Sequence, residues 1–326
     1  MMGRSASLFD TASRAPLRVG LALMTGVEIV GQTFDLHSQM VNSLYASGAG
    51  FLLRLIPPSD FVLASLLAVG LAGLVAFARD RRPIVGGLVT LACMALLSEW
   101  ITERFGSTPH NMFYPGGMLL GWIAGLWYAR TTAREGLHGA AVGADREQLA
   151  EAGAMGVLAA LYVGSGVSKV LQGGIGWADL TTLRSTILAQ QCLGSWRWVE
   201  AYRSVVIEHP RFAQALATGA LGVELGGFFL LVNRSLRVFW GLLILGLHVN
   251  ILLLCTIPYV EPMVLVPLFT LPWPALLGML QRKRPTEAAV PSPPDAAPVT
   301  EVPIPVAMVA LTLALLVLSL LSRLRR

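Results

Sequence analysis

Apolar runs of about 20 residues recur along the whole chain, and arginines cluster in the short stretches between them. A helix of that length crosses the hydrocarbon core of a bilayer, because each residue adds about 1.5 Å to its length. The runs show no alternation of apolar and polar residues, which argues against a membrane β-barrel. The pattern therefore predicts an all-α integral membrane protein, folded as a polytopic bundle of transmembrane helices.

The runs predict eight or nine transmembrane helices, depending on whether the first one crosses completely. That first run covers residues 17–34 and is interrupted by Glu28 and Gln32. The remaining spans are expected at residues 61–78, 84–101, 112–128, 150–171, 212–232, 238–255, 260–280 and 303–321. Only 13% of the residues are charged, whereas about 25% is usual in soluble domains, so the composition agrees with this interpretation.

Three segments are expected from the distribution of prolines and apolar residues. Residues 1–280 form the transmembrane bundle, in which Pro258 separates the seventh span from the eighth. Residues 281–302 are rich in proline and alanine, which is typical of an extended linker. Residues 303–326 form a last transmembrane helix with a basic tail.

Basic residues in the short loops predict the orientation, because such residues are retained on the cytoplasmic side of bacterial membranes. Placing the N-terminus in the cytoplasm puts the clusters Arg79 to Arg82, Arg130 to Arg146 and Arg282 to Arg284 on the same side. Residues 172–211 then form a long outer loop. The net charge of +5 arises from these clusters at span ends, so we expect membrane lipid and no nucleic acid as a partner.

With this orientation, polar residues of several spans reach a similar depth in the outer half of the membrane. Lys169, the only lysine between residues 1 and 282, lies near the outer end of its span. His110 precedes the fourth span, His248 lies just beyond the midplane of the seventh, and Asn250 is close to it. Glu224 is near the middle of the sixth span. We expect the outer residues to line one cavity that opens to the outer side.

Each of these residues also has a purely structural interpretation. Lys169 can extend its ammonium group to the outer headgroups, and His248 can bond to a neighbouring helix. His110 and Asn111 can cap the fourth helix. An ionised Glu224 near the bilayer centre would cost about 3 kcal/mol, which predicts that this residue is paired or protonated.

The same residues allow a limited set of reactions. A lysine in a poorly solvated place can lose its proton and act as a general base, and a nearby histidine can orient a substrate oxygen or stabilise an anion. The sequence contains no nucleophile-elbow serine, no H-E-x-x-H pattern and no phosphate-binding glycine loop. The cysteines have no metal-ligand spacing, so no metal site is predicted.

Three stretches around these residues resemble a known family. The segment Tyr162-Val-Gly-Ser-Gly-Val-Ser-Lys169, followed by Trp177, is similar to a helix motif of vitamin K-dependent γ-glutamyl carboxylase and of the bacterial HTTM (horizontally transferred transmembrane) proteins. Pro109-His110-Asn111-Met-Phe-Tyr114 resembles the family's first histidine motif. Leu247-His248-Val-Asn250, with Ile257-Pro258-Tyr259 after it, resembles the second. Val223-Glu224-Leu225-Gly226 resembles the helix that precedes it, and the similarity covers residues from about 15 to 280.

The resemblance implies a helical bundle in the bacterial cytoplasmic (inner) membrane, with an active site facing the periplasm. In the carboxylases, the lysine that matches Lys169 deprotonates vitamin K hydroquinone. Reaction of this quinol with O2 yields a strong base, which removes a γ-proton from peptide glutamate before CO2 adds. The resemblance thus implies Lys169, His110 and His248 as catalytic residues, with a quinol, O2 and CO2 as cofactors. The candidate substrate-binding residues are Tyr114, Trp177, Glu224, Asn250 and Tyr259.

The sequence departs from the carboxylases in ways that leave other functions open. Ser168 stands where the family has a second lysine, and Pro109 stands where the carboxylases have asparagine. A proline-rich stretch and one apolar run stand where the carboxylases have a large soluble domain. One alternative is a non-enzymatic membrane protein that binds lipid, quinone or peptide, such as a component for maturation or export of toxin peptides. Another is a transporter, although the halves show no internal repeat.

Overall fold

The computed structural model describes residues 15–41, 59–105, 112–134, 146–190 and 196–273, and this part of the chain is helical without any strand. The predicted all-α architecture is therefore confirmed for it. The long helices are α1 (Ala15–Val41), α3 (Asp60–Ala78), α4 (Pro83–Phe105), α5 (Phe113–Arg134), α6 (Arg146–Gly173), α9 (Pro210–Leu225) and α10 (Arg234–Cys255). The shorter elements are η3 (Gly174–Ala178), α7 (Thr182–Ala189), α8 (Arg197–Glu208), η4 (Gly226–Leu231) and α11 (Val260–Thr270).

Six segments in the described part are helical, long and apolar enough to cross a membrane, as expected for a multi-pass membrane protein. They comprise α1, α3, α4, α6, α9 with η4, and α10. Helix α5 lies where the fourth span is predicted, but glycines and aromatic residues replace much of the aliphatic content there. Residues 274–280 of the predicted eighth span, the linker at 281–302 and the last helix at 303–326 lie outside the described residues.

The polar residues of the first span do not break its helix. Glu28 is fully buried, and Gln32 is buried one turn later on the same face. The Gln32 side-chain amide donates a hydrogen bond to Glu28 Oε1 over 2.6 Å. This contact places both groups inside the bundle, where a spanning helix can tolerate them.

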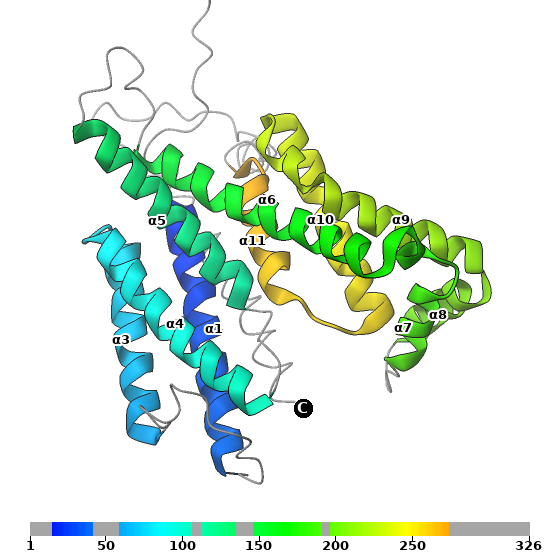
Figure 1. Ribbon diagram of the computed structural model, residues 1–326, viewed down its shortest axis with the longest axis horizontal. Helices are drawn as coiled ribbons and strands as arrows, with labels where there is room; N and C mark the ends of the chain where they lie inside the picture. Colours follow the sequence, from blue (N-terminus) through cyan, green and yellow to red (C-terminus); the bar gives the residue numbers. More distant parts are fainter. Residues whose placement is uncertain (1–14, 42–58, 106–111, 135–145, 191–195, 274–326) are drawn as a thin grey trace, which may run out of the picture.

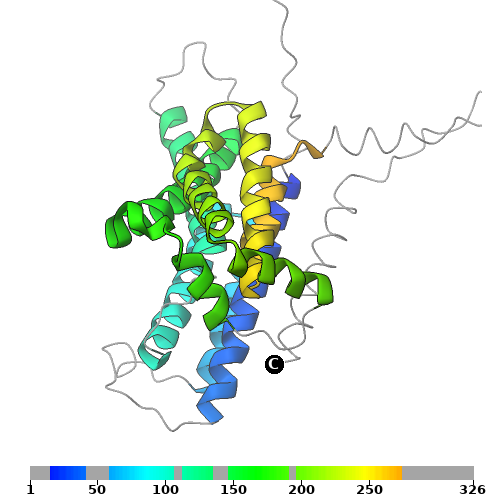
Figure 2. The same cartoon turned by 90° about the vertical axis from the view of Figure 1, so that its right-hand side faces the viewer.

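The long helices form two groups that are connected through α6 and α11. Helices α1, α3, α4 and α5 pack on one side of the molecule, and α9 and α10 lie on the other (Figure 1). Helix α6 packs against α5 in the first group and against α9 in the second. Helix α11 lies alongside α1, as the turned view also shows (Figure 2). Helix α6 therefore joins the two groups, and α11 also contacts both of them, through α10 on one side and α1 and α5 on the other.

The contact between α5 and α6 depends on glycines. A Cβ atom at Gly121 or at Gly125 of α5 would overlap the backbone of α6, and a Cβ atom at Gly153 of α6 would overlap the Gly121 carbonyl group. Small residues at such spacing let membrane helices approach closely enough for their backbones to touch. The α5–α6 pair therefore brings the two groups of helices together along a tight seam.

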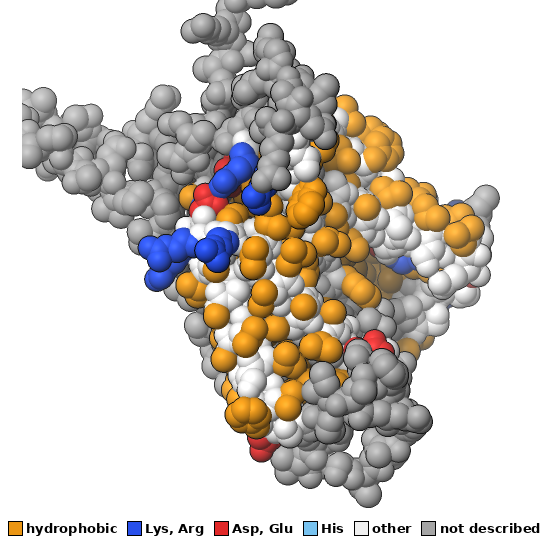
Figure 3. All heavy atoms as spheres, turned by 60° about the vertical axis from the view of Figure 1, so that its left-hand side comes forward, with side chains coloured by type: hydrophobic (Ala, Val, Ile, Leu, Met, Phe, Trp, Pro, Cys, Tyr) orange, Lys and Arg blue, Asp and Glu red, His pale blue; other side chains and the backbone are white. Residues whose placement is uncertain are grey.

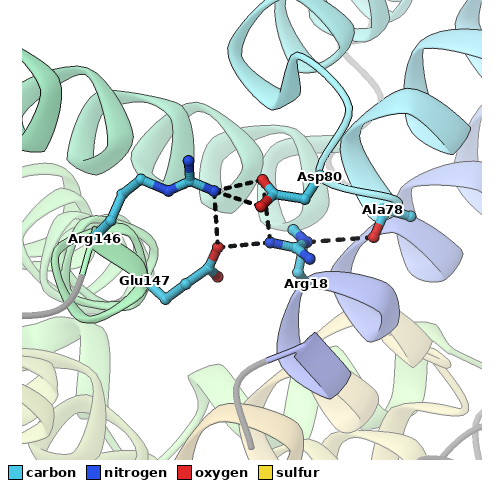
Figure 4. A network of polar contacts seen from close by, with 5 residues as sticks. All are labelled: Arg18, Ala78, Asp80, Arg146 and Glu147. Carbon is cyan, nitrogen blue, oxygen red and sulfur yellow. Dashed lines mark hydrogen bonds and ion pairs between the residues drawn. The ribbon is translucent and has the colours of Figure 1, made fainter. Parts of the chain in front are cut away.

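A network of charged side chains joins several helix ends at one end of the bundle (Figure 4). Arg18 of α1 donates hydrogen bonds to Glu147 at 2.6 Å and to the Ala78 carbonyl oxygen at 3.3 Å. Arg146 of α6 contacts both carboxylate oxygens of Asp80 at 2.5 and 2.6 Å. We name this the basic end, and by the orientation predicted from the sequence it is the cytoplasmic one.

The expected outer loop at 172–211 contains helices instead of a simple connection. Asp179 accepts hydrogen bonds from the backbone N–H groups of Thr182 and Thr181. These bonds stabilise the start of α7 and lower the pKa of Asp179 to about 2.

Helix α8 packs against α10 through two hydrogen bonds. The Tyr202 hydroxyl donates to Asn250 Oδ1 at 2.7 Å, and Arg203 Nε donates to the Leu253 carbonyl oxygen at 2.8 Å. Burial against α10 raises the pKa of the Tyr202 phenol.

Candidate functional site

The Lys169 ammonium group forms an ion pair with the Glu224 carboxylate and contacts both of its oxygens. The Lys169 side chain is 27% exposed, and that of Glu224 is only 8% exposed. The sequence predicts that Glu224 is paired or protonated, and the pairing is confirmed. The sequence did not predict that its partner is Lys169, because it placed the two residues at different depths.

Further contacts hold the lysine in place. Lys169 Nζ donates to Ser165 Oγ over 3.1 Å, and Ser165 Oγ donates to Glu224 Oε1 over 3.3 Å. The ammonium nitrogen also lies 5.1 Å from the centroid of the Trp177 ring, in the geometry of a cation–π contact. The ammonium group is therefore turned toward protein groups, although part of the side chain reaches the surface.

Close backbone packing between α6 and α9 makes the ion pair possible. A Cβ atom at Gly166 would come within 3.0 Å of the Leu225 backbone nitrogen, so only glycine lets α9 approach this closely. At Gly227 of η4, a Cβ atom would come within 2.8 Å of Tyr162. The chain changes from α-helix to 3-10 helix directly after Leu225, so Glu224 occupies the last turn of α9.

His248 of α10 lies in an aromatic cluster next to this pair. Its side chain is only 4% exposed, and its Nε2 is hydrogen-bonded to the Tyr162 hydroxyl at 2.8 Å. The rings of Tyr259 and Tyr114 have centroids 5.7 and 6.4 Å from that of His248. His248 Nδ1 has no hydrogen-bond partner within the described ranges. The expected bond from His248 to a neighbouring helix is therefore present, and its partner is Tyr162 of α6.

The ion pair and the aromatic cluster share one face of α6. Tyr162, Ser165 and Lys169 are spaced three and seven residues apart, so their side chains follow one another along the helix. Tyr162 contacts His248, and Lys169 contacts Glu224, about 10 Å further along the axis. The arrangement is a polar stripe between α6, α9 and α10.

The other predicted site residues fall into different places. Tyr114, Trp177, Glu224 and Tyr259 belong to this stripe or border it. Asn250 instead bonds to Tyr202 of α8 and, through its amide nitrogen, to the Gly246 carbonyl oxygen of its own helix. His110 lies outside the described residues.

Sequence reasoning overlooked Tyr162 and Ser165 as members of the site, although both stand in the segment that carries the family resemblance. Their spacing from Lys169 is a usable signal, because residues three, four or seven positions apart share a helix face. The spacing does not reveal the partner of each residue, because the partner depends on how α9 and α10 are rotated against α6.

The arrangement brings aromatic rings, phenols, an imidazole and an ion pair close together. Aromatic rings offer stacking surfaces, the phenols and the imidazole can exchange hydrogen bonds, and the Lys169–Glu224 pair can donate or accept a proton. Electrostatic interactions between such groups are stronger where water is scarce, because they are less screened there.

Replacing Tyr162 with phenylalanine is expected to lower the stability of the protein by about 1 to 2 kcal/mol, because it removes the hydrogen bond to a buried histidine. Thermal unfolding in detergent measures the effect. The matched control is Tyr128→Phe, since Tyr128 is 58% exposed and should tolerate the change. Equal melting temperatures for the two variants would show that the Tyr162–His248 bond contributes nothing.

Comparisons with protein-family models, with curated proteins and with solved structures find no match to this chain.

Proposed function

We propose that this protein binds a quinol, or a similar phenolic small molecule or peptide group, at the outer side of the bacterial inner membrane, and that Lys169 removes a proton from it. The main support is the Lys169–Glu224 pair, which places a proton donor and a proton acceptor beside the buried Tyr162–His248 contact. The resemblance of the segment from Tyr162 to Lys169 to the carboxylase and HTTM motif supports the same conclusion.

The contacts suggest how the lysine would be prepared for this role. Glu224 is in direct contact with the ammonium group, so it can accept the lysine proton and leave a neutral amine. The amine then takes a proton from the ligand hydroxyl, and the resulting anion lies beside the lysine ammonium group. Trp177 and the rings around His248 would hold the ligand plane.

The resemblance extends this proposal to a complete reaction. A bound quinol would supply, when O2 oxidises it, the strong base that the carboxylases use before CO2 adds to the substrate. In that scheme, His248 and, by family resemblance, His110 would orient the ligand oxygens. Residues of this chain would thus bind the ligand, exclude water and move one proton.

Replacing Lys169 with arginine tests the role of the lysine as a base. Arginine keeps the positive charge beside Glu224, but it cannot give up its proton at any pH that proteins tolerate. We expect Lys169→Arg to lower the rate of oxygen-dependent oxidation of vitamin K hydroquinone by at least about 100-fold, in line with the usual size of general-base effects. Quinol binding, followed by fluorescence quenching of the tryptophans, should remain within a few fold of the original protein.

A binding protein without catalysis is the second candidate. It is favoured by the direct contact of Lys169 with Glu224, since each group already satisfies the other. In that case the original protein oxidises no quinol, and Lys169→Arg binds ligand as the original does. Oxidation by the arginine variant at the original rate would contradict the role of Lys169 as base.

A further inference from the structure

An apolar groove of about 800 Å³ runs between α1 and α3. On α1, lining residues extend from Val19 to Ser38, whereas those on α3 extend only from Leu71 to Ala78. Nearly all the side chains in the lining are apolar, and Val75 is 49% exposed. Both helices therefore line the groove only near the basic end, along residues 71–78 of α3. Beyond this stretch, α1 alone contributes lining residues.

The two-walled part extends through about two thirds of one leaflet of a bilayer. Residues 71–78 span about 10 Å of helix, and the opposite residues of α1 begin at Val19, beside Arg18 of the charged network. Half of the hydrocarbon core is about 15 Å thick. The two-walled part is thus long enough for most of one acyl chain and too short for a transmembrane helix.

A cluster of free arginines stands where the groove ends. Ala78 is the last lining residue on α3, and the turn that follows it carries Arg79, Arg81 and Arg82, all of which are exposed. Among the residues that the structure describes, none of these arginines has an ion-pair partner. Figure 3 shows Lys and Arg atoms gathered at the edge of a largely hydrophobic face.

The carboxylate in the middle of this turn does not neutralise the cluster. Asp80 points toward the interior of the network, where it contacts Arg146 and lies 3.4 Å from Arg18 Nη1 (Figure 4). Asp80 and Arg82 both have a φ of 56°, so the backbone reverses direction tightly between α3 and α4. The turn therefore directs its acidic side chain inward and leaves the three guanidinium groups at the surface.

We propose that the α1–α3 groove and the turn at residues 79–82 form a binding site for one anionic phospholipid from the leaflet at the basic end. An acyl chain would lie between α1 and α3, and the headgroup phosphate would accept hydrogen bonds from Arg79, Arg81 and Arg82. A second protein helix fits less well, because it would leave three guanidinium groups without an anionic partner. This site is separate from the Lys169 stripe and does not depend on its proposed function.

The test measures lipid retention by the purified full-length protein with native mass spectrometry. Phosphatidylglycerol and phosphatidylcholine with identical acyl chains are added in equal amounts, and inorganic phosphate is added alone in a third sample. Each arginine near an anionic headgroup contributes about a fivefold preference, so the protein should retain phosphatidylglycerol at least about tenfold better. Inorganic phosphate should not be retained.

Two sets of variants locate the site. The triple variant Arg79→Gln, Arg81→Gln and Arg82→Gln should reduce phosphatidylglycerol retention to the level of phosphatidylcholine. Its matched control replaces the exposed Arg130, Arg197 and Arg211 with glutamine, which removes the same charge elsewhere and should change nothing.

A third variant tests the groove itself. Val75→Trp fills the space between α1 and α3 from a side chain that is already half exposed, so folding should survive, and it should reduce the retention of both lipids. Unchanged retention in this variant or in the triple variant at residues 79–82 would overturn the proposal. An equal loss in the matched control, or retention of inorganic phosphate in the sample without lipid, would overturn it as well.

Discussion

Replacing Lys169 with methionine is expected to destabilise the protein by roughly 3 kcal/mol, because the change leaves the Glu224 carboxylate buried without its cation. Glu224 is only 8% exposed, so water cannot take the place of the lysine. Within the described ranges, the Ser165 hydroxyl offers the one remaining hydrogen bond to it. Unfolding by a denaturing detergent, followed by the loss of helical signal, measures the change in stability.

The double variant Lys169→Met with Glu224→Leu is the control for this prediction. It removes both charges and keeps apolar volume, and such replacements of buried ion pairs are often neutral or stabilising. We therefore expect the double variant to recover most of the lost stability, and the difference between the two gives the coupling energy of the pair. A double variant that is less stable than Lys169→Met alone would mean that the two charges do not depend on each other.

Replacing Gly153 with leucine is expected to cost at least about 3 kcal/mol and to separate α5 from α6. A Cβ atom at Gly153 would overlap the Gly121 carbonyl group, which is backbone and cannot move aside as a side chain would. Because α6 joins the two groups of helices, the change should also reduce the yield of folded protein. Size-exclusion elution and thermal unfolding in detergent measure both effects.

The matched control lies on the same helix, three residues further along. A Cβ atom at Gly156 would meet nothing within 4 Å, so Gly156→Leu adds the same side chain at an open position. We expect this variant to fold and melt like the original protein. Similar losses in both variants would indicate that leucine disturbs α6 itself and that the seam with α5 is unimportant.

Hydropathy was sufficient to locate the long helices of the bundle. The predicted spans from residue 17 to residue 255 all coincide with helices. In lipid, backbone N–H and C=O groups without hydrogen bonds are costly, and an apolar run of this length satisfies them by forming a helix. The same reasoning failed at residues 172–211, where α7 and α8 stand in place of a loop. The apolar stretches of α7 and α8 are too short to suggest a span. Helix α8 is positioned by contacts of Tyr202 and Arg203 with α10.

The sequence pointed to Lys169 and Glu224 of the stripe, but it did not reveal their pairing or the membership of Tyr162 and Ser165. Hydropathy and topology predict the depth of Lys169 and His248, but a single sequence does not give the rotation of one helix against another. Glu224 was placed near the midplane, yet the close approach at Gly166 and the long lysine side chain bring the two charges together. The role of Tyr162 as the partner of His248 likewise depends on the packing of α6 against α10.

Helix α6 is held by charged contacts near both of its ends, which limits where the molecule can move. Near its start, Arg146 bonds to Asp80 and Glu151 pairs with Arg237 of α10 at 3.0 Å. Lys169, about 35 Å from Arg146 and about 27 Å from Glu151 along the helix, pairs with Glu224. Sliding α6 by one turn would break these contacts together. We therefore expect that any opening of the Lys169–Glu224 pair comes from the α9 side, where the 3-10 segment η4 follows Glu224 and can act as a hinge.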